Sequence, residues 1–227
     1  MSRHELTPTK AWIYAGLVLA GGVGAACIVS VVHKPLIKAG DRLLLVGDSL
    51  SVGLAVPLRA LAKEARYEFA HLGKVGSVTN LWAGEGQEGG QFSALLRSYR
   101  PTVVLVSLGT NDEWIPKYNP GANVLRQQQP QLDRLVAKIR AAGAVPLWIG
   151  PPLHNYPPAA DFRAYIRKLV GNDHYFHSER YSIPRNPPPD TVPHPTVKGY
   201  AAWAGAVWRW LETGRAPASL APTAPAP

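Results

Sequence analysis

The sequence predicts an α/β fold in which helices cover both faces of a mostly parallel sheet. Short, continuous apolar runs alternate along the chain with segments whose apolar residues recur at helical spacing. Continuous apolar runs are typical of strands that are buried on both faces, as in parallel sheets. In such sheets the ligand site lies beyond the carboxyl ends of the strands. The residues that follow each predicted strand are therefore the first candidates for a functional site.

Four segments are predicted to be strands because they are short and largely apolar, and because each of them ends at a glycine. The clearest is PTVVLVSLG (101–109), in which four aliphatic residues follow one another. The other three are DRLLLVG (41–47), YEFAHLG (67–73) and AVPLWIG (144–150).

Helices are predicted between and after these strands. SLSVGLAVPLRALAKEAR (49–66) has leucines at helical spacing, and Pro57 is expected to kink this helix. Residues 124–143 form an amphipathic pattern that ends at Gly143, a plausible C-terminal cap. Further helices are predicted at 92–100, 159–171 and 196–214. The glycine-rich segment GEGQEGG (84–90) is predicted to be a flexible loop.

The first 40 residues differ from the rest of the chain. Residues 11–32 contain no charged side chain, and this stretch is long enough for a helix to cross a bilayer. We expect an uncleaved membrane anchor; the alternatives are a cleaved signal peptide, whose apolar region is usually shorter, and a lipoprotein signal at Cys27. Positive charges flank both sides almost equally, so they do not predict the orientation of the anchor.

The domain organisation follows from these segments. A Pro/Ala-rich stretch at the end of the chain lacks periodic apolar residues and is expected to be a disordered tail. We therefore predict an N-terminal segment (1–10), a transmembrane anchor (11–32), a linker (33–40), a folded domain (41–214) and a tail (215–227).

Composition excludes some classes of site. The net charge is +9, but the positive residues are spread along the chain without a nucleic-acid-binding motif, so we expect a solvated basic surface and no nucleic-acid partner. Cys27 is the single cysteine, which excludes an intramolecular disulfide and a cysteine zinc site. His174 and His177 lack partners at metal-ligand spacing, and no metal or cofactor is expected.

Three polar clusters follow predicted strands, and a fourth precedes the last predicted helix. They are GDS (47–49), KVGSVTNLW (74–82), GTND (109–112) and DTVPHPT (190–196). Each has an ordinary structural explanation: Ser49 could be a helix cap, Asn111 part of an Asx turn, and His194 a surface histidine. Together, however, they supply a hydroxyl, a backbone amide at Gly76, a side-chain amide and an imidazole at one sheet edge. Those groups are the parts needed for acyl transfer.

The order of these clusters resembles the SGNH hydrolases, also called the GDSL esterase/lipase family, over nearly all of residues 41–212. GDSL (47–50) is similar to the nucleophile block, Gly76 to the glycine block, and GTND (109–112) to the asparagine block. HPTVKGYAAWA (194–204) is similar to the region of the catalytic histidine. A single block of this kind is weak evidence for the family, whereas four blocks in the right order are strong evidence. The resemblance implies a flavodoxin-like three-layer α/β/α sandwich.

The resemblance also implies a role for each site residue. Ser49 would be the nucleophile, and His194 would take its proton and later give it to the leaving alcohol. The backbone N–H groups of Ser49 and Gly76 and the Asn111 amide would form the oxyanion hole. Asp190 would orient His194, although the family has Asp-x-x-His and this chain has one residue more between the two. The alternative is that a backbone carbonyl or another acid orients His194.

The function implied is a membrane-anchored serine esterase whose catalytic domain lies outside the cytoplasm, at a bacterial inner membrane facing the periplasm. Bacterial members of this kind deacetylate or deacylate cell-envelope glycans, so an acylated glycan is the expected substrate. Two alternatives stay open: a lysophospholipase or thioesterase that acts on lipid acyl esters, and a catalytically silent fold that binds a glycan or a protein. The sequence does not predict an oligomeric state.

Overall fold

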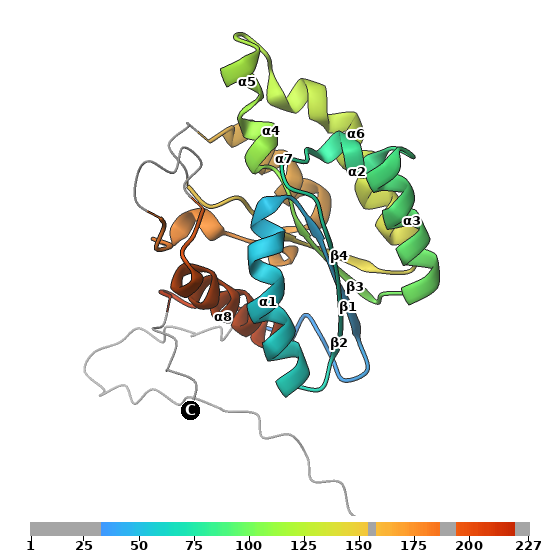
Figure 1. Cartoon of the computed structure of the whole chain (residues 1–227), viewed down its shortest axis with the longest axis vertical. Coiled ribbons are helices and arrows are strands. Elements are labelled where there is room, and N and C mark those ends of the chain that lie inside the picture. The colour runs from blue at the N-terminus through green and yellow to red at the C-terminus, as the bar shows by residue number, and fades with distance from the viewer. Residues whose placement is uncertain (1–32, 154–157, 187–193, 221–227) are drawn as a thin grey trace, which may run out of the picture. The chain divides into compact units, whose positions relative to one another are not determined.

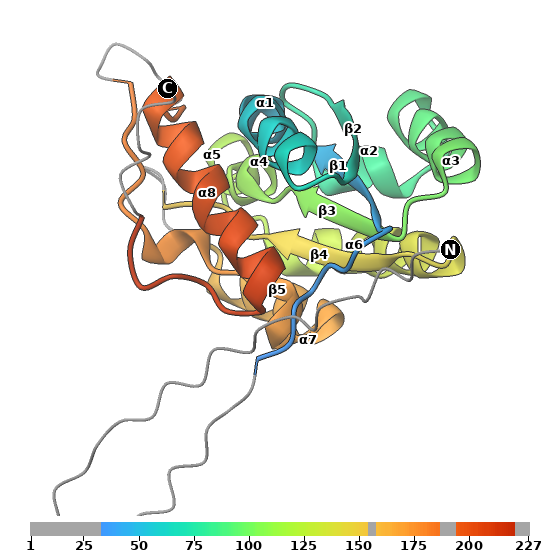
Figure 2. The ribbon, with the colours of Figure 1, turned by 90° about the horizontal axis from the view of Figure 1, so that it is seen from below.

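Five parallel strands form one sheet in the order β2-β1-β3-β4-β5 (Figures 1 and 2). The computed structural model describes residues 33–153, 158–186 and 194–220. The strands are β1 (Arg42–Gly47), β2 (Glu68–Gly73), β3 (Val103–Ser107), β4 (Val145–Ile149) and β5 (Tyr175–Phe176). The predicted parallel sheet is confirmed, and the two-residue β5 is an addition to it.

The core lies in two layers because successive side chains of a buried strand point to opposite faces of the sheet. On β1, Leu43 and Leu45 belong to one apolar cluster, and Leu44 and Val46 belong to the other. All four side chains are fully buried. This double burial explains why the strand sequence is continuously apolar rather than alternating.

Helices cover both faces of the sheet, as predicted. One face carries α1 (Ser49–Glu64) and α8 (Val197–Thr213), which pack against each other. The other face carries α2 (Thr79–Ala83), α3 (Gln87–Tyr99), α6 (Val124–Ala141) and α7 (Ala160–Val170). Figure 1 shows α1 and α8 on one side of the strands and α2, α3 and α6 on the other.

Short helices lie after β3 and on both sides of β5. They are α4 (Thr110–Glu113), α5 (Ile115–Tyr118) and the 3-10 helices η1 (Asn172–His174) and η2 (Ser178–Arg180). The sequence analysis did not predict these four helices or α2. A helix of three to five residues is too short to show apolar periodicity, which explains the omission.

Residues 84–90 do not form one flexible loop, because α3 begins at Gln87. The first turn of α3 packs closely on the chain before it. A Cβ at Gly89 would lie 1.9 Å from the carbonyl oxygen of Gly84, so only glycine fits there. Gly89, one of the glycines that suggested flexibility, therefore serves close packing.

The described residues on both sides of the predicted domain pack onto it. Ile37, in the segment predicted as a linker, is buried, and the N–H of Leu36 donates to the Leu211 carbonyl at 2.8 Å. Pro217 follows α8, and its carbonyl accepts a hydrogen bond from the Tyr181 hydroxyl. Residues 33–40 and 215–220 thus contribute to the folded unit.

The predicted membrane anchor at residues 11–32 and the segment 1–10 lie outside the described residues. Within the described ranges, no helix combines the length and the apolar character that a bilayer crossing requires. The last seven residues of the predicted tail, 221–227, also lie outside the described ranges.

Replacing Gly47 by alanine is expected to destabilise the fold by roughly 1–3 kcal/mol, since overpacking a tight interior costs that much. A Cβ at Gly47 would lie 2.0 Å from the Ser107 carbonyl oxygen, at the point where β1 pairs with β3. Urea unfolding followed by tryptophan fluorescence measures the change. Gly205→Ala on α8 is the matched control, because no atom lies within 4 Å of its added Cβ. Equal stability of the two variants would contradict the steric argument.

Candidate active site

Ser49 lies at the turn from β1 into α1, at the carboxyl edge of the sheet. Asp48 is the N-terminal cap of α1, and its Oδ1 accepts a hydrogen bond from the Leu50 N–H at 2.9 Å. The capping role that Ser49 could have had therefore belongs to Asp48. Ser49 is the first residue of the helix, and its hydroxyl is free to interact elsewhere.

The hydroxyl of Ser49 and the imidazole of His194 lie together. The distance between Ser49 Oγ and His194 Nε2 is 3.0 Å, although 145 residues separate them in the sequence. A serine hydroxyl within hydrogen-bond reach of a histidine is the arrangement that activates a serine nucleophile. The structure thus brings together the two residues that the sequence assigned to nucleophile and base.

Backbone hydrogen bonds fix the chain around His194. Its carbonyl accepts from the Asn186 N–H at 3.0 Å, and the N–H of Thr196 donates to the Pro184 carbonyl at 2.9 Å. Thr196 then caps α8, since its hydroxyl oxygen accepts from the Gly199 N–H at 3.0 Å. The start of α8 and the strand-like segment 184–186 therefore hold His194 beside α1.

The segments of Gly76 and Asn111 are tied to each other. The Asn111 side-chain amide donates to the Ser77 carbonyl at 2.9 Å. The next residue, Asp112, accepts from the N–H of Thr79 at 3.0 Å and from its hydroxyl at 3.2 Å. Gly76 has a φ of +76°, a left-handed conformation that favours glycine. Asp112 therefore anchors the loop that contains Gly76, here called the glycine loop, to the end of β3.

Trp82 supports the glycine loop through a hydrogen bond to Ser77. Its side chain is fully buried in the core, and its indole N–H donates to the Ser77 hydroxyl at 2.9 Å. Trp82 is therefore part of the core and does not line the site. It fixes the residue whose carbonyl receives the Asn111 amide.

Asp190, the acid predicted to orient His194, lies outside the described residues. Its role stays a prediction. No group of three or more histidine, cysteine, aspartate or glutamate side chains within the described ranges could hold a metal ion.

A buried polar network behind the site was not predicted. Arg163 on α7 forms a bidentate ion pair with Glu113 of α4, and it also donates to the Pro151 carbonyl at 2.9 Å. Glu179 lies 3.7 Å from Arg163 and 2.7 Å from the ring of His177. This network joins the ends of β3, β4 and β5. Its signal in the sequence was a charged residue on the apolar face of a helix, where Arg163 shares its side with Ile166 and Val170.

A second serine and histidine pair lies beneath the nucleophile. The Ser51 hydroxyl donates to the Asp48 carbonyl at 2.7 Å and lies 3.2 Å from His71 Nε2. A Cβ at Gly73 would lie 2.7 Å from Ser51 Oγ, so the glycine at the end of β2 makes room for this contact. Burial lowers the pKa of His71, and the nearby Arg59 adds to the effect. This pair supports the turn that carries Ser49.

Burial raises the pKa of Asp48 and that of Asp112 to about 7, from an ordinary value of 3.8. Hydrogen bonds from backbone N–H groups oppose this shift without cancelling it. The folded state therefore binds these two protons more tightly than the unfolded state does. Their contribution to stability is complete below pH 3.8 and is lost as the pH rises through about 7.

Asp48→Asn is expected to flatten the dependence of unfolding free energy on pH between pH 3.8 and about 7, because the variant removes one of these two groups. Urea unfolding at a series of pH values measures the slope. A slope equal to that of the wild-type protein would show that Asp48 does not titrate in this range.

Comparison with known proteins agrees with this geometry. The model of the GDSL-like lipase/acylhydrolase family matches residues 45–202. The chain therefore belongs to this family of hydrolases, as the order of the four sequence blocks indicated. A comparison with curated proteins found no match.

Solved structures share the fold at low sequence identity. A variant of Axe2, an acetyl xylan esterase from Geobacillus stearothermophilus, is 16% identical with a TM-score of 0.57, over 80% of this chain and 99% of that one. The acetyl xylan esterase AlAXEase is 18% identical with a TM-score of 0.53, over 74% and 98%. The psychrotrophic esterase EstA from Pseudoalteromonas sp. is 20% identical with a TM-score of 0.50, over 75% and 98%. These likenesses support the α/β/α fold.

Proposed function

We propose that the domain is a serine carboxylic-ester hydrolase in which Ser49 is the nucleophile and His194 is the general base. The observation that carries this proposal is the 3.0 Å contact between Ser49 Oγ and His194 Nε2. Ser49 Oγ attacks the ester carbonyl carbon while its proton passes to Nε2. The tetrahedral intermediate then expels the alcohol, which takes that proton, and leaves an acyl-enzyme. Water, activated by His194, hydrolyses the acyl-enzyme and restores the serine.

Three donors are proposed to stabilise the oxyanion of the intermediate: the backbone N–H groups of Ser49 and Gly76 and the side-chain amide of Asn111. The amide nitrogen of Asn111 carries two hydrogens, and the Ser77 carbonyl accepts only one of them. The second hydrogen is available for the oxyanion. The same bond to Ser77 fixes the orientation of the amide, which is the preorganisation that such donors need.

Asp190 is proposed to orient the other ring nitrogen of His194. The four-residue step from Asp190 to His194 differs from the family spacing by one residue, and prolines on both sides of His194 restrict the turn. An aspartate in this role would hold the tautomer in which Nε2 accepts the serine proton.

The proposed substrate is an acetylated glycan of the cell envelope. The similarity in fold to proteins named acetyl xylan esterases supports an acetyl ester on a sugar as the starting hypothesis. We further propose that residues 11–32 anchor the enzyme in the bacterial inner membrane, with the catalytic domain in the periplasm. The uncharged length of this segment supports the anchor.

Two measurements on the full-length chain test this function. A fluorophosphonate probe, which reacts with activated serines, should label the wild-type protein on the peptide that contains Ser49. Turnover of p-nitrophenyl acetate should exceed turnover of p-nitrophenyl octanoate if the acyl group is small. Preference for the octanoyl ester would favour the lipid-directed alternative, and a chain that neither reacts with the probe nor hydrolyses any ester would be a binding module.

A further inference from the structure

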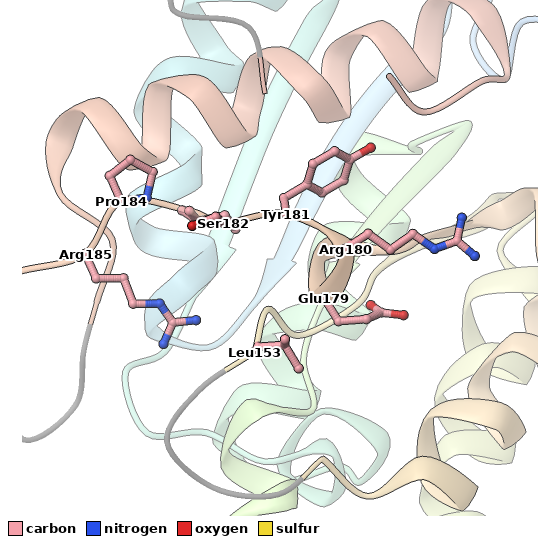
Figure 3. Close-up of a pocket in the computed structure, with 8 residues that line it drawn as sticks. Leu153, Glu179, Arg180, Tyr181, Ser182, Pro184 and Arg185 are labelled. Carbon is pink, nitrogen blue, oxygen red and sulfur yellow. The ribbon is translucent and has the colours of Figure 1, made fainter. Parts of the chain in front are cut away.

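A cavity of about 660 Å³ opens between the segments that follow β4 and β5. Leu153, after β4, lines one side of it, and residues 179–185, after β5, line the rest (Figure 3). Both segments follow the carboxyl ends of their strands, which is the edge of the sheet where ligands bind in folds of this kind. Neither Ser49 nor His194 lines the cavity itself; the wall of the cavity is linked to His194 through the backbone of residues 184–186.

The cavity wall and the chain of His194 are joined through the backbone. Arg185 forms an antiparallel bridge with Pro195, and the Asn186 N–H donates to the His194 carbonyl at 3.0 Å. One residue earlier, the Pro184 carbonyl accepts from the Thr196 N–H at 2.9 Å. The backbone of Arg185 is therefore fixed opposite Pro195, the residue that follows His194.

Glu179 and Arg185, two charged residues that line this cavity, differ in their partners. The Glu179 carboxylate is engaged by the ring of His177 at 2.7 Å and lies 3.7 Å from Arg163. Among the described residues, in contrast, no acidic side chain lies within ion-pair distance of Arg185. Figure 3 shows the Arg185 side chain extending towards Leu153, whereas Glu179 and Arg180 extend away from Arg185.

Burial makes the charged form of the Arg185 side chain less favourable than it would be in water. Its side chain is partly buried, and this burial lowers the pKa of its guanidinium. The guanidinium nevertheless remains charged at neutral pH, because arginine side chains in proteins stay protonated. A desolvated cation in a cavity gains most from an anionic ligand, and its planar fork matches the two oxygens of a carboxylate or a phosphate.

We propose that Arg185 is a specificity-determining residue that binds an anionic group, a carboxylate or a phosphate, carried by the ester substrate. The proposal rests on the proposed esterase function and adds that the preferred ester is negatively charged close to the scissile bond. For a glycan substrate, this means an acidic sugar rather than a neutral one. Arg180, which is exposed on the same cavity, adds to the positive field but is not needed to position the anion.

The test compares three acetyl esters that differ in charge: para-acetoxybenzoate, para-acetoxyphenyl phosphate and the neutral para-acetoxybenzamide. For each charged ester, kcat/KM is divided by kcat/KM for the amide, in the wild-type full-length chain and in Arg185→Gln. The intrinsic reactivity of each ester cancels when the two proteins are compared. The ratio for at least one charged ester should fall about tenfold or more in the variant, which is the usual worth of a hydrogen bond to a charged group. Whichever ratio falls identifies carboxylate or phosphate as the preferred anion.

Arg209→Gln is the matched control, because Arg209 is exposed on α8 and the substitution removes the same charge far along that helix from His194. Its ratios should equal those of the wild-type protein, which separates a local contact from the effect of net charge. A measurement on the wild-type protein does not depend on the folding of any variant: added salt should lower the ratios for the charged esters.

Ratios that are equal in wild type and Arg185→Gln, and that salt does not change, would overturn the role of Arg185 while leaving the esterase intact. Hydrolysis of none of the three esters by the wild-type chain would instead be a failure of the proposed function. An equal fall of the ratios in Arg209→Gln would also overturn the proposal, because general charge would then explain the preference.

Discussion

Ser49→Ala is expected to lower kcat for an acetyl ester by at least about 10,000-fold, the loss that follows removal of the nucleophile from serine hydrolases. The substitution deletes one oxygen atom, the atom that lies 3.0 Å from His194 Nε2. The fold should tolerate it, because Asp48 and not Ser49 caps α1, and alanine is favourable in a helix. Initial rates with p-nitrophenyl acetate, together with a thermal unfolding curve, measure both effects.

The control for this variant is Ser93→Ala, which removes a serine hydroxyl from α3 on the other face of the sheet. It should keep wild-type activity. The double variant Ser49→Ala/His194→Ala should lose no more activity than Ser49→Ala alone, since the two residues act as one unit. Two losses that multiply would show that His194 does not act through Ser49, and full activity in Ser49→Ala would place the nucleophile elsewhere.

The sheet could be predicted from sequence because its strands are buried on both sides. In β3 every residue is buried, and all of its side chains except that of the last residue, Ser107, are apolar. No exposed face requires polar residues along the strand, so the apolar run is continuous. The long helices were predictable for the complementary reason, since their one-sided burial gives a period. β5 has two residues, which is too few for any pattern, and it is recognisable only through its pairing with β4.

The contact between Ser49 and His194 was predictable from the sequence, but the residues that support it were not. Ser49, Gly76, Asn111 and His194 are in short blocks whose order is specific, so a resemblance could assign them without coordinates. Asp48 is buried, and its Oδ2 has no hydrogen-bond partner within the described ranges, a situation that depends on the packing of several segments. No local pattern carries that information, because desolvation is a property of the assembled fold.

Arg163 is the clearest example of a residue whose burial and pairing depend on the assembled fold. Its replacement by methionine is expected to cost about 3–5 kcal/mol of stability. Its side chain is 4% exposed, and its partner Glu113 is fifty positions away in the sequence at 1% exposure. Removing the arginine leaves a carboxylate buried without its main counter-charge, and it also leaves the Pro151 carbonyl without its donor. Urea unfolding followed by tryptophan fluorescence measures the loss.

The design of this experiment separates the ion pair from simple loss of packing. Lys168→Met is the control on the same helix, since Lys168 is exposed and should change stability by less than about 0.5 kcal/mol. Arg163→Met/Glu113→Met should be more stable than Arg163→Met alone, because the second substitution removes the stranded charge and fills the space with apolar atoms. If the double variant is instead less stable than the single one, the cost of Arg163→Met arises from lost packing, and the buried pair does not hold the ends of β3 and β4 together by charge.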